Sequence, residues 1–304
     1  MARYDIVRPA TREAWLALRN EGIGSSEVGV IAGVSRFQTP IGLYLKKKGL
    51  AAPEPESSVM AAGHEFEPLV AYRYALETGD VMDPASEGDW LAVSKAKPFL
   101  RVSPDRIFWS KDIPAAERTY DNAYIFEAKT TKMAVTPDDF PKSWFLQVQY
   151  QMGVMGIKKA VIGWFSYADC LRFGYVKVPF NAVIFAEIER MLTSFWNDNV
   201  LAGRMPEKVL TNEDAALRWP KEIAEAVSVA PASLEDDVRY YNELSAKTSE
   251  MTKQMDDIKV RVKTFMKETS ELHNSRGRTI VTWKASKSSD GAAGARRITF
   301  KKIA

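Results

Sequence analysis

One short stretch, Tyr124–Lys129, constrains the fold more than any other part of the 304-residue chain. Its residues, Tyr-Ile-Phe-Glu-Ala-Lys, have the pattern of a β-strand, so Glu127 and Lys129 leave one face while the residues on either side of Glu127 leave the other. A Ser-Pro-Asp triplet that ends at Asp105 lies within a second strand-like run, residues 99–109. If the two runs pair, Asp105, Glu127 and Lys129 meet on one face of one sheet.

These three side chains have the chemistry that metal-dependent cleavage of a phosphodiester requires. Two carboxylates hold a hard divalent cation through oxygen, and a lysine beside them can steady a water nucleophile and the charge that builds on phosphate. The alternative is that this acid-x-Lys pattern forms only an exposed cross-strand ion pair, worth a few tenths of a kcal/mol. The triplet alone favours the ion pair, and three further segments shift the balance toward a catalytic site.

The first of these segments is the start of a predicted helix over residues 62–78. Glu67 precedes the first apolar stripe of this helix, and Pro68 suits its first turn. Glu67 is therefore either a charge that stabilises the helix N-terminus or a third carboxylate for the metal. His64, three residues earlier, is either a structural group or a support for the ligands.

The second segment is a predicted helix over residues 138–156 that carries three glutamines, Gln147, Gln149 and Gln151. Gln147 and Gln151 lie one turn apart on one face, and Gln149 lies on another. One of these amides can hydrogen-bond a nucleophilic water or a metal-bound oxygen. A polar helix face accounts for them equally well.

The third segment lies near the N-terminus, where a short predicted helix containing Arg19 leads into Gly-Ile-Gly-Ser-Ser-Glu at residues 22–27. Backbone N–H groups at a helix start bind anions, and a serine hydroxyl and an arginine add to such a site. We therefore expect Arg19, Ser25 and Ser26 to form a phosphate pocket. The simpler alternative is that one of the serines only caps the helix.

The order of these motifs resembles the YqaJ / phage lambda exonuclease family of the PD-(D/E)XK nuclease superfamily. The matching motifs are Arg19 with Ser25-Ser26-Glu27-Val28, Gly63 with Glu67, Ser103-Pro104-Asp105, Glu127-Ala128-Lys129 and Gln147-Val148-Gln149-Tyr150. Each motif alone is weak, but five in this order at these distances are specific. The resemblance covers about residues 12–205, and it departs from the family pattern where Arg106, rather than glycine, follows Asp105.

The resemblance implies a role for each matching residue. The implied metal ligands are Glu67, Asp105, Glu127 and the backbone carbonyl of Ala128, and the implied catalytic residues are Asp105, Glu127, Lys129 and Gln147. Lys129 and Gln147 would place the water. Arg19 and Ser26, with Ser25 beside them, would hold the 5′-phosphate of a DNA end. The implied cofactor is Mg²⁺, two ions per site, with Mn²⁺ as a substitute.

The function implied by the resemblance is a Mg²⁺-dependent 5′-to-3′ exonuclease. Such an enzyme degrades one strand of double-stranded DNA from its ends and supplies single strands for phage-type homologous recombination by single-strand annealing. The implied partners are double-stranded DNA ends, further copies of the chain in a homo-oligomeric ring, and a single-strand annealing protein. Two rival functions are an endonuclease of the same superfamily and a non-catalytic DNA-end-binding protein on the same fold. The intact acid–acid–lysine set argues against the second rival.

Composition sets few further limits. The chain is 46% hydrophobic and 27% charged, as in ordinary globular proteins. Its net charge is only +3, so any track for DNA must come from local clusters such as Lys46–Lys48, Lys158–Lys159 or Arg296–Arg297. The single cysteine, Cys170, excludes an internal disulfide and an all-cysteine metal cluster. Without a span-length apolar run or a signal-peptide pattern, we expect a cytoplasmic protein with no membrane partner. The resemblance implies a phage or prophage protein in a bacterial host.

The pattern of elements predicts an α/β fold. The expected core elements are helix 62–78, strands 89–95, 99–109 and 123–129, helix 138–156, a hairpin of 160–167 against 171–178, and a helix from Asn181. Helices that flank a central mixed sheet give this class, and the resemblance implies a PD-(D/E)XK, or restriction-endonuclease-like, core. The large apolar residues of the last helix, between Ile184 and Trp196, are expected to be core residues and not a platform for stacking bases.

Three regions are expected along the chain: an exonuclease core at 1–205, a connector at 206–232, and a C-terminal helical arm with a β-hairpin at 233–304. From Leu244 to Leu272 apolar residues recur at spacings of three and four, which predicts a heptad stripe on a helix of about 40 residues. A stripe of that length left in water would be an aggregation-prone patch. We therefore expect it to be buried, against another subunit, the core or a partner.

Overall fold

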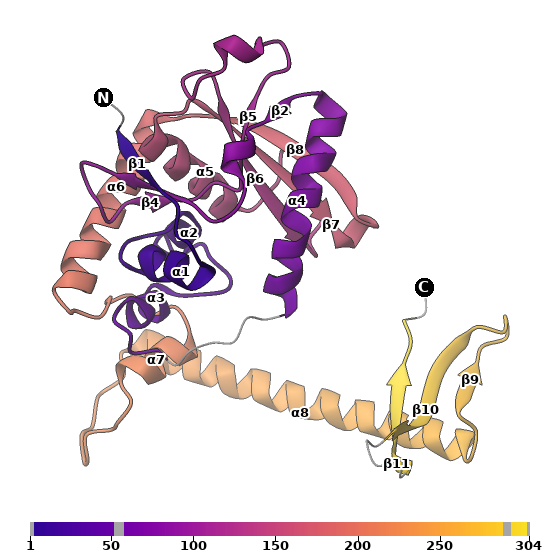
Figure 1. Ribbon diagram of the computed structural model, residues 1–304. Coiled ribbons are helices and arrows are strands. Elements are labelled where there is room, and N and C mark those ends of the chain that lie inside the picture. The colour runs from indigo at the N-terminus through magenta and orange to yellow at the C-terminus, as the bar shows by residue number, and fades with distance from the viewer. Residues whose placement is uncertain (1–2, 52–57, 288–292, 303–304) are drawn as a thin grey trace. The chain divides into compact units, whose positions relative to one another are not determined.

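A computed structural model describes residues 3–51, 58–287 and 293–302 of the chain (Figure 1). The chain folds into two compact units, residues 1–222 and 223–304. The boundary between them falls inside the predicted connector, residues 206–232. Across the described residues, no helix combines the length and the apolar character needed to cross a membrane.

The first unit is the core. Its strands are β1 (Tyr4–Val7), β2 (Val81–Met82), β3 (Leu91–Ser94), β4 (Arg101–Val102), β5 (Arg106–Trp109), β6 (Tyr124–Thr131), β7 (Lys159–Ser166) and β8 (Arg172–Pro179). Its α-helices are α1 (Arg12–Asn20), α2 (Val28–Ile31), α3 (Pro40–Lys47), α4 (Ser58–Thr78), α5 (Lys142–Met155), α6 (Ala182–Ser194) and α7 (Asn212–Arg218). Short 3-10 turns lie at Ser25–Glu27, Pro84–Ser86, Ala115–Glu117 and Tyr167–Asp169, and a π-helix continues α6 over Phe195–Leu201.

A five-stranded mixed sheet organises this unit, in the order β2-β5-β6-β7-β8. Strands β6 and β7 are parallel, and the other neighbours are antiparallel. Figure 1 shows α4 and α5 on opposite faces of the sheet, where Phe126 packs with Tyr74 of α4 and Ile125 belongs to the cluster that contains Val148 of α5. The predicted α/β class, with a central mixed sheet between helices, is confirmed.

The run 99–109 was expected as one strand, and the structure splits it between two sheets. Strand β4 joins a separate three-stranded sheet of order β1-β3-β4, whereas β5 joins the central sheet. Pro104 lies at the break, where its missing N–H prevents it from continuing a ladder. Strand β5 pairs antiparallel to β6 with Arg106 opposite Phe126, so the preceding residue, Asp105, comes to lie beside Glu127.

Helix α4 begins at Ser58, earlier than the predicted start at residue 62, and Pro68 lies inside it rather than in its first turn. Ala61 and Ala62 are strong helix formers that favour this extension. Tyr74 is fully buried against the sheet, which offsets the hydrogen bond that Pro68 cannot donate. Glu67 therefore lies in the middle of a helix, and its alternative role as an N-terminal helix charge is excluded.

The predicted helix after Asn181 is confirmed as α6. The Asn181 side chain accepts hydrogen bonds from the amides of Val183 and Ile184 and so caps its start. Ile188 is 3% exposed, and Trp196 stacks on Phe99 with ring centroids 5.7 Å apart. These large apolar side chains are core residues, as expected.

The second unit contains α8 (Ala232–Met266), β9 (Glu271–His273), β10 (Thr279–Lys287) and β11 (Ala293–Phe300). Its strands form an antiparallel sheet in the order β11-β10-β9. Helix α8 has 35 residues and ends before Lys267, which has a φ of 47°, so the predicted helix of about 40 residues is too long. Leu272, the last residue of the predicted stripe, lies in β9 instead.

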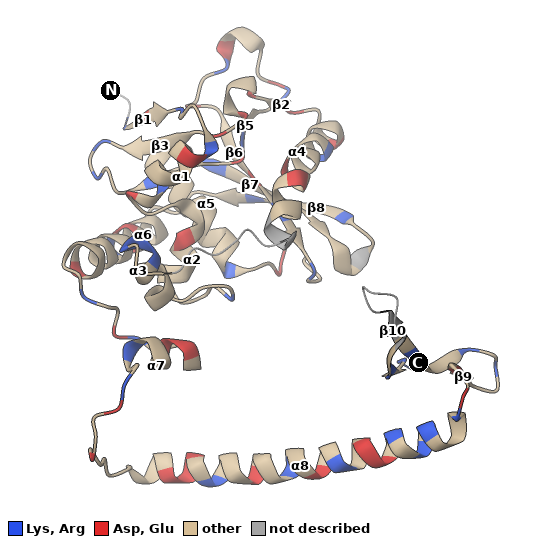
Figure 2. Ribbon diagram, turned by 60° about the horizontal axis from the view of Figure 1, so that its bottom comes forward, with Lys and Arg blue, Asp and Glu red and all other residues tan. Residues whose placement is uncertain are grey.

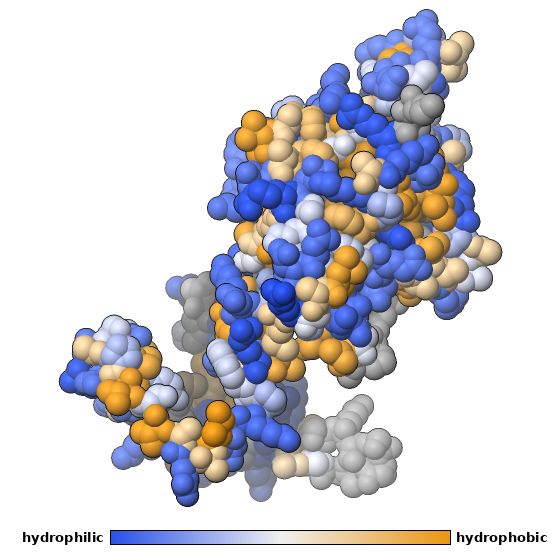
Figure 3. All heavy atoms as spheres, turned by 90° about the vertical axis from the view of Figure 1, so that its left-hand side faces the viewer, coloured by the Kyte–Doolittle hydropathy of each residue, from blue (hydrophilic) through white to orange (hydrophobic). Residues whose placement is uncertain are grey.

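The stripe on α8 is not buried within its own unit. Leu244 is 43% exposed, Met251 64% and Phe265 75%. Packing inside this unit therefore does not cover the stripe. Its burial against a surface outside the unit stays a prediction. Figure 3, coloured by hydropathy, shows hydrophobic side chains intermixed with hydrophilic ones over the face that it presents.

Candidate functional site

Strand β6 carries Glu127 and Lys129, with Ala128 between them on the opposite face, as its alternation predicts. Ala128 packs in the cluster under α4. The backbone N–H of Ala128 donates a hydrogen bond of 2.7 Å to Oδ2 of Asp105. The pairing of β5 with β6 thus brings Asp105 to the strand that holds the other two residues, as the sequence predicts.

Both carboxylate oxygens of Glu127 accept hydrogen bonds. Oε1 accepts from Lys129 Nζ at 2.6 Å and from Gln147 Nε2, and Oε2 accepts from Gln151 Nε2 at 2.8 Å. Lys129 Nζ also donates to Gln147 Oε1 at 3.0 Å. The Glu127 side chain is only 3% exposed, so this network holds a buried carboxylate in one orientation.

Glu67 approaches the same site from α4. Its Oε1 lies 3.1 Å from Nδ1 of His64, so His64 supports the carboxylate. Burial raises the pKa of Glu67, the neighbouring His64 opposes this, and the charge of Glu127 raises it further. Glu67 and Glu127 are therefore close enough for each negative charge to affect the other.

Asp105 completes a group of three interacting carboxyls. Burial raises its pKa well above the ordinary value, and the charges of Glu127 and Glu67 raise it further. Burial alone would lower the pKa of Lys129, but Glu127 and Asp105 raise it above the ordinary value, so Lys129 is a cation. Carboxylates that repel one another in this way are stabilised by any further positive charge placed between them.

The donor set fits a hard divalent cation. Glu67, Ala128 and Lys129 line a cavity of about 180 Å³ together with Gly63, Val70 and Thr130. Carboxylate and carbonyl oxygens are the ligands that Mg²⁺ takes in proteins. Within the described part of the chain, however, no three His, Cys, Asp or Glu side chains are arranged as a metal-binding cluster. Glu127 bonds to Lys129 instead, so an ion shared by these carboxylates would require them to rearrange.

The three glutamines of α5 have different roles. Gln147 lies in the Glu127 network, as expected. Gln149 ties α5 to the start of α6, since Nε2 donates to the Pro179 carbonyl at 2.8 Å and Oε1 accepts from the Asn181 amide at 2.8 Å. Gln151, one of the three candidate amides of the sequence analysis but not one of the implied catalytic residues, also bonds to Glu127.

Arg19 and Ser26 come together as predicted. A guanidinium nitrogen of Arg19 donates to Ser26 Oγ, and the guanidinium lies 5.1 Å from the ring centre of Trp15. Ser25 differs from the expectation, because it is buried and its Oγ accepts a 3.4 Å hydrogen bond from the amide of Ser103. Ser25 therefore joins the phosphate-pocket segment to the loop that leads to Asp105.

One charged pair beside this segment was not predicted from the sequence. Lys47 Nζ lies 2.9 Å from Glu27 Oε2, and the Lys47 side chain is only 1% exposed. Burial lowers the pKa of Lys47, while Glu27 opposes the shift. Lys46–Lys48 is therefore not the uniform surface track that the sequence suggests. The helical spacing could have indicated this burial, because Lys47 follows the buried Leu43 and Tyr44 by four and three residues on α3.

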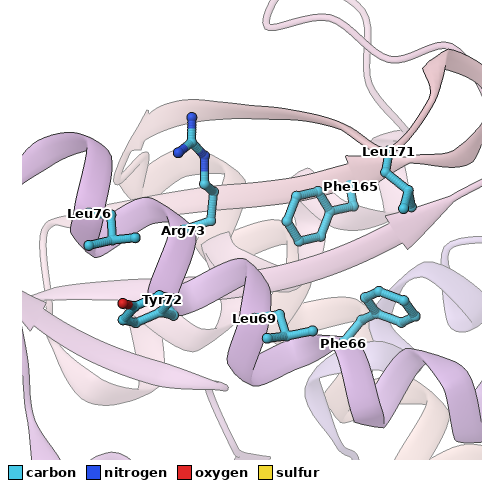
Figure 4. A pocket seen from close by; sticks show the side chains of 7 residues that line it. All are labelled: Phe66, Leu69, Tyr72, Arg73, Leu76, Phe165 and Leu171. Carbon is cyan, nitrogen blue, oxygen red and sulfur yellow. The ribbon is translucent and has the colours of Figure 1, made fainter.

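A larger cavity, of about 290 Å³, lies between α4 and the end of β7 and is almost entirely apolar (Figure 4). Its lining residues are Phe66, Leu69, Tyr72, Arg73, Leu76, Phe165 and Leu171. The charged member, Arg73, pairs with Glu77 at 3.2 Å. This cavity has no carboxylate in its lining and does not contribute to the carboxylate site.

Comparison with known proteins gives three findings. Residues 14–158 match the family model of the YqaJ-like viral recombinase domain. A Bacillus subtilis (strain 168) protein described as uncharacterized protein YqaJ is 25% identical over 269 residues, which are 85% of this chain and 79% of that protein. LHK-Exo, an alkaline exonuclease from Laribacter hongkongensis crystallised with dAMP, is 19% identical with a TM-score of 0.48, covering 63% of this chain and 93% of that one.

A further solved structure, a phage-related exonuclease from Haemophilus somnus 129PT, is 11% identical with a TM-score of 0.41. The match covers 60% of this chain and 96% of that exonuclease chain.

Proposed function

Because this chain belongs, through residues 14–158, to the YqaJ-like viral recombinase domain family, we propose that it is a Mg²⁺-dependent exonuclease. It degrades one strand of double-stranded DNA from its 5′ end and supplies single strands for recombination by annealing. The observation that carries the proposal is the geometry around β6. Asp105 accepts from the Ala128 amide, Glu127 accepts from Lys129, and Glu67 lines one cavity with Ala128 and Lys129. A homo-oligomeric ring and a single-strand annealing partner belong to the proposal by likeness to the family.

Each residue of the site has a distinct task in this reaction. Glu67, Asp105 and Glu127 would hold Mg²⁺, together with the carbonyl of Ala128. A bound Mg²⁺ supplies Lewis-acid stabilisation of phosphate charge and a more acidic water. Lys129 carries a positive charge toward the phosphate, where negative charge develops in the transition state.

Gln147 and Gln151 orient the side chains and the water around Glu127. Gln147 bonds to both Glu127 and Lys129, so it sets the angle between the carboxylate and the ammonium group. Gln151 is fully buried, and its Oε1 has no hydrogen-bond partner among the described residues. That oxygen is available to accept a hydrogen bond from a water near Glu127.

A cleavage assay on two forms of the same DNA tests the proposal against its rivals. Linear duplex should be degraded in Mg²⁺ and left intact in EDTA, whereas a covalently closed circle should survive both conditions. Cutting of the closed circle would favour the endonuclease. A failure to cut either form, with binding to ends retained, would favour the non-catalytic end-binding protein.

The 5′-phosphate pocket gives a second prediction. Linear duplex with a 5′-phosphate should be degraded faster than the same duplex with a 5′-hydroxyl, and Arg19→Ala should shrink that difference by about tenfold or more, because a hydrogen bond to a charged group contributes about 1.5–3 kcal/mol. Degradation rates on both substrates measure the effect. Arg12→Ala is a matched control, since Arg12 lies on the same helix and over the same Trp15 ring at 4.1 Å. Equal wild-type rates on both ends would remove the pocket from the mechanism.

The raised pKa values of Asp105 and Glu67 predict a dependence of Mg²⁺ affinity on pH. Burial and neighbouring carboxylates keep protons on these groups above the ordinary carboxyl range of about pH 4. Metal binding requires the ionised oxygens and releases those protons. The Mg²⁺ concentration for half-maximal degradation should therefore fall as pH rises through the range where both groups ionise. A half-saturation that does not change with pH would contradict this account.

A further inference from the structure

Charge is distributed very unevenly along the second unit. Residues 259–304 contain twelve Lys and Arg against three Asp and Glu, a net charge of +9, whereas residues 223–258 contain three against eight, a net charge of −5. The core, residues 1–222, is nearly neutral, with 27 basic and 28 acidic residues. Figure 2 shows the basic residues gathering toward the C-terminal end of α8. The overall charge of +3 hides this concentration.

The register of the C-terminal sheet places basic side chains on one face. Lys284 of β10 lies opposite Arg297 of β11, and Thr282 lies opposite Thr299. Directly paired residues of antiparallel strands project from the same face. Lys301 follows β11 and continues its ladder, since its backbone N–H donates to the Ile280 carbonyl at 2.8 Å, so alternation adds Lys301 to this face. This basic face consists of Thr282, Lys284, Arg297, Thr299 and Lys301. It also carries one carboxylate, because Glu271 of β9 lies opposite Thr282.

The other face of the sheet is used for packing. Val281 is 3% exposed, and Met266 at the end of α8 is 1% exposed. Arg296 belongs to this face: its guanidinium carbon lies 3.7 Å from the ring centre of Trp283, and it donates to the carbonyls of Lys267 at 2.8 Å and Thr269. Arg296 therefore fastens the sheet to the end of α8 and is not available to a ligand.

The cations of the basic face and of the adjoining loop are exposed. Arg276 and Arg278 in the loop between β9 and β10 are exposed, as are Arg297 and Lys301. Lys284 pairs with Glu271, but among the residues that the structure describes, none of the other four has a carboxylate within salt-bridge distance. Two of these four cations lie on the sheet and two in the adjoining loop, and none is paired with a carboxylate of the described residues.

We propose that the basic face, with Arg276 and Arg278, binds the phosphate backbone of double-stranded DNA separately from the carboxylate site. Lysine and arginine neutralise phosphates, and threonine hydroxyls donate to phosphate oxygens. A protein that lies on a lipid surface instead combines basic residues with large apolar ones that insert, and Thr282 and Thr299 occupy the central paired positions of this face. The choice of DNA rests on the proposed function of the core.

Binding of the full-length protein to DNA without cleavage tests this inference. The probe is a covalently closed duplex circle in EDTA, which has no ends and cannot be degraded. The Arg297→Gln/Lys301→Gln variant should bind about tenfold more weakly near 0.1 M salt, and the slope of log affinity against log salt should shrink by about 0.9 for each phosphate that the variant no longer neutralises. Lys247→Gln/Lys253→Gln is the matched control, because it removes the same charge from exposed positions in the acidic part of the unit.

The outcomes separate this inference from the proposed function. Equal affinity and equal salt slope for the two variants would overturn it, as would a weakening confined to vesicles of phosphatidylserine and phosphatidylcholine. If wild-type protein failed to degrade linear DNA in Mg²⁺ while closed-circle binding still required Arg297 and Lys301, the proposed function would fall and the inference would stand. If the first variant did not fold, Arg276→Gln/Arg278→Gln in the loop would replace it under the same criteria.

Discussion

Asp105→Asn is expected to abolish Mg²⁺-dependent cleavage and, at the same time, to stabilise the protein without metal. Loss of a ligand charge removes several kcal/mol of transition-state stabilisation, about 10³-fold or more in rate. The stability effect has the opposite sign because the pKa of Asp105 is raised in the folded protein. A carboxyl of this kind destabilises the fold increasingly as pH rises above its unfolded-state pKa. Asparagine cannot ionise, and its side-chain oxygen can still accept from the Ala128 amide.

Degradation of linear duplex and thermal unfolding as a function of pH measure the two effects. The gain in melting temperature over wild type should be small at acid pH and should grow toward neutral pH. Asp112→Asn is the control, because Asp112 is an exposed acid that lies after β5, and it should change neither measurement. Near wild-type degradation by Asp105→Asn would remove Asp105 from the ligand set, whatever its stability.

Lys129→Met is expected to lower both activity and stability. The Lys129 and Glu127 side chains are 20% and 3% exposed, and removal of one partner from a buried ion pair costs about 3–5 kcal/mol. The rate should fall by about 10²- to 10³-fold, since the variant lacks a positioned donor to the transition state. Methionine keeps much of the side-chain volume, so the change is mainly electrostatic.

Two further measurements separate charge from packing in this variant. The double variant Lys129→Met/Glu127→Gln should recover much of the stability and none of the activity, because the unpaired carboxylate is gone. Mg²⁺ should raise the melting temperature of Lys129→Met more than that of wild type, because the ion replaces the missing cation. If the double variant were as unstable as the single one, the Lys129 side chain would stabilise the fold by packing alone.

Strand β6 could be predicted from the sequence because the pattern that identifies it is local. Alternation alone assigns Glu127 and Lys129 to one face, and strand pairing then brings Asp105 to them. The end of β4 was missed because residues 99–109 are β-prone throughout, while sheet membership depends on distant partners: β3 for one half and β6 for the other. The start of α4 was missed because Pro68 is a first-turn signal that tertiary burial overrides.

Burial of charge was the least predictable property. Lys47 belongs to a lysine triplet that has the pattern of solvated surface, and its partner Glu27 comes from a different element. Ser25 was expected to face a phosphate, but its hydroxyl oxygen accepts a hydrogen bond from the amide of Ser103. Both errors concern contacts between segments far apart in the sequence, about which local patterns contain no information. The exposure of Met251 on α8 is a third such case, since a heptad stripe shows that a surface is apolar and not what covers it.

The hydrogen bond between Ser25 and Ser103 has a consequence for the products of the reaction. It joins Ser25, the neighbour of the proposed phosphate-binding residue Ser26, to a residue only two positions before Asp105, so a short stretch of chain connects the proposed pocket to the carboxylate site. When a terminal phosphate is held at a constant distance from the cleavage site, that distance sets the length of the product. If the proposed pocket holds the terminal phosphate, the protein should release products of one uniform length, and lengthening the chain between Ser103 and Asp105 should change that length or make it less uniform before it stops cleavage.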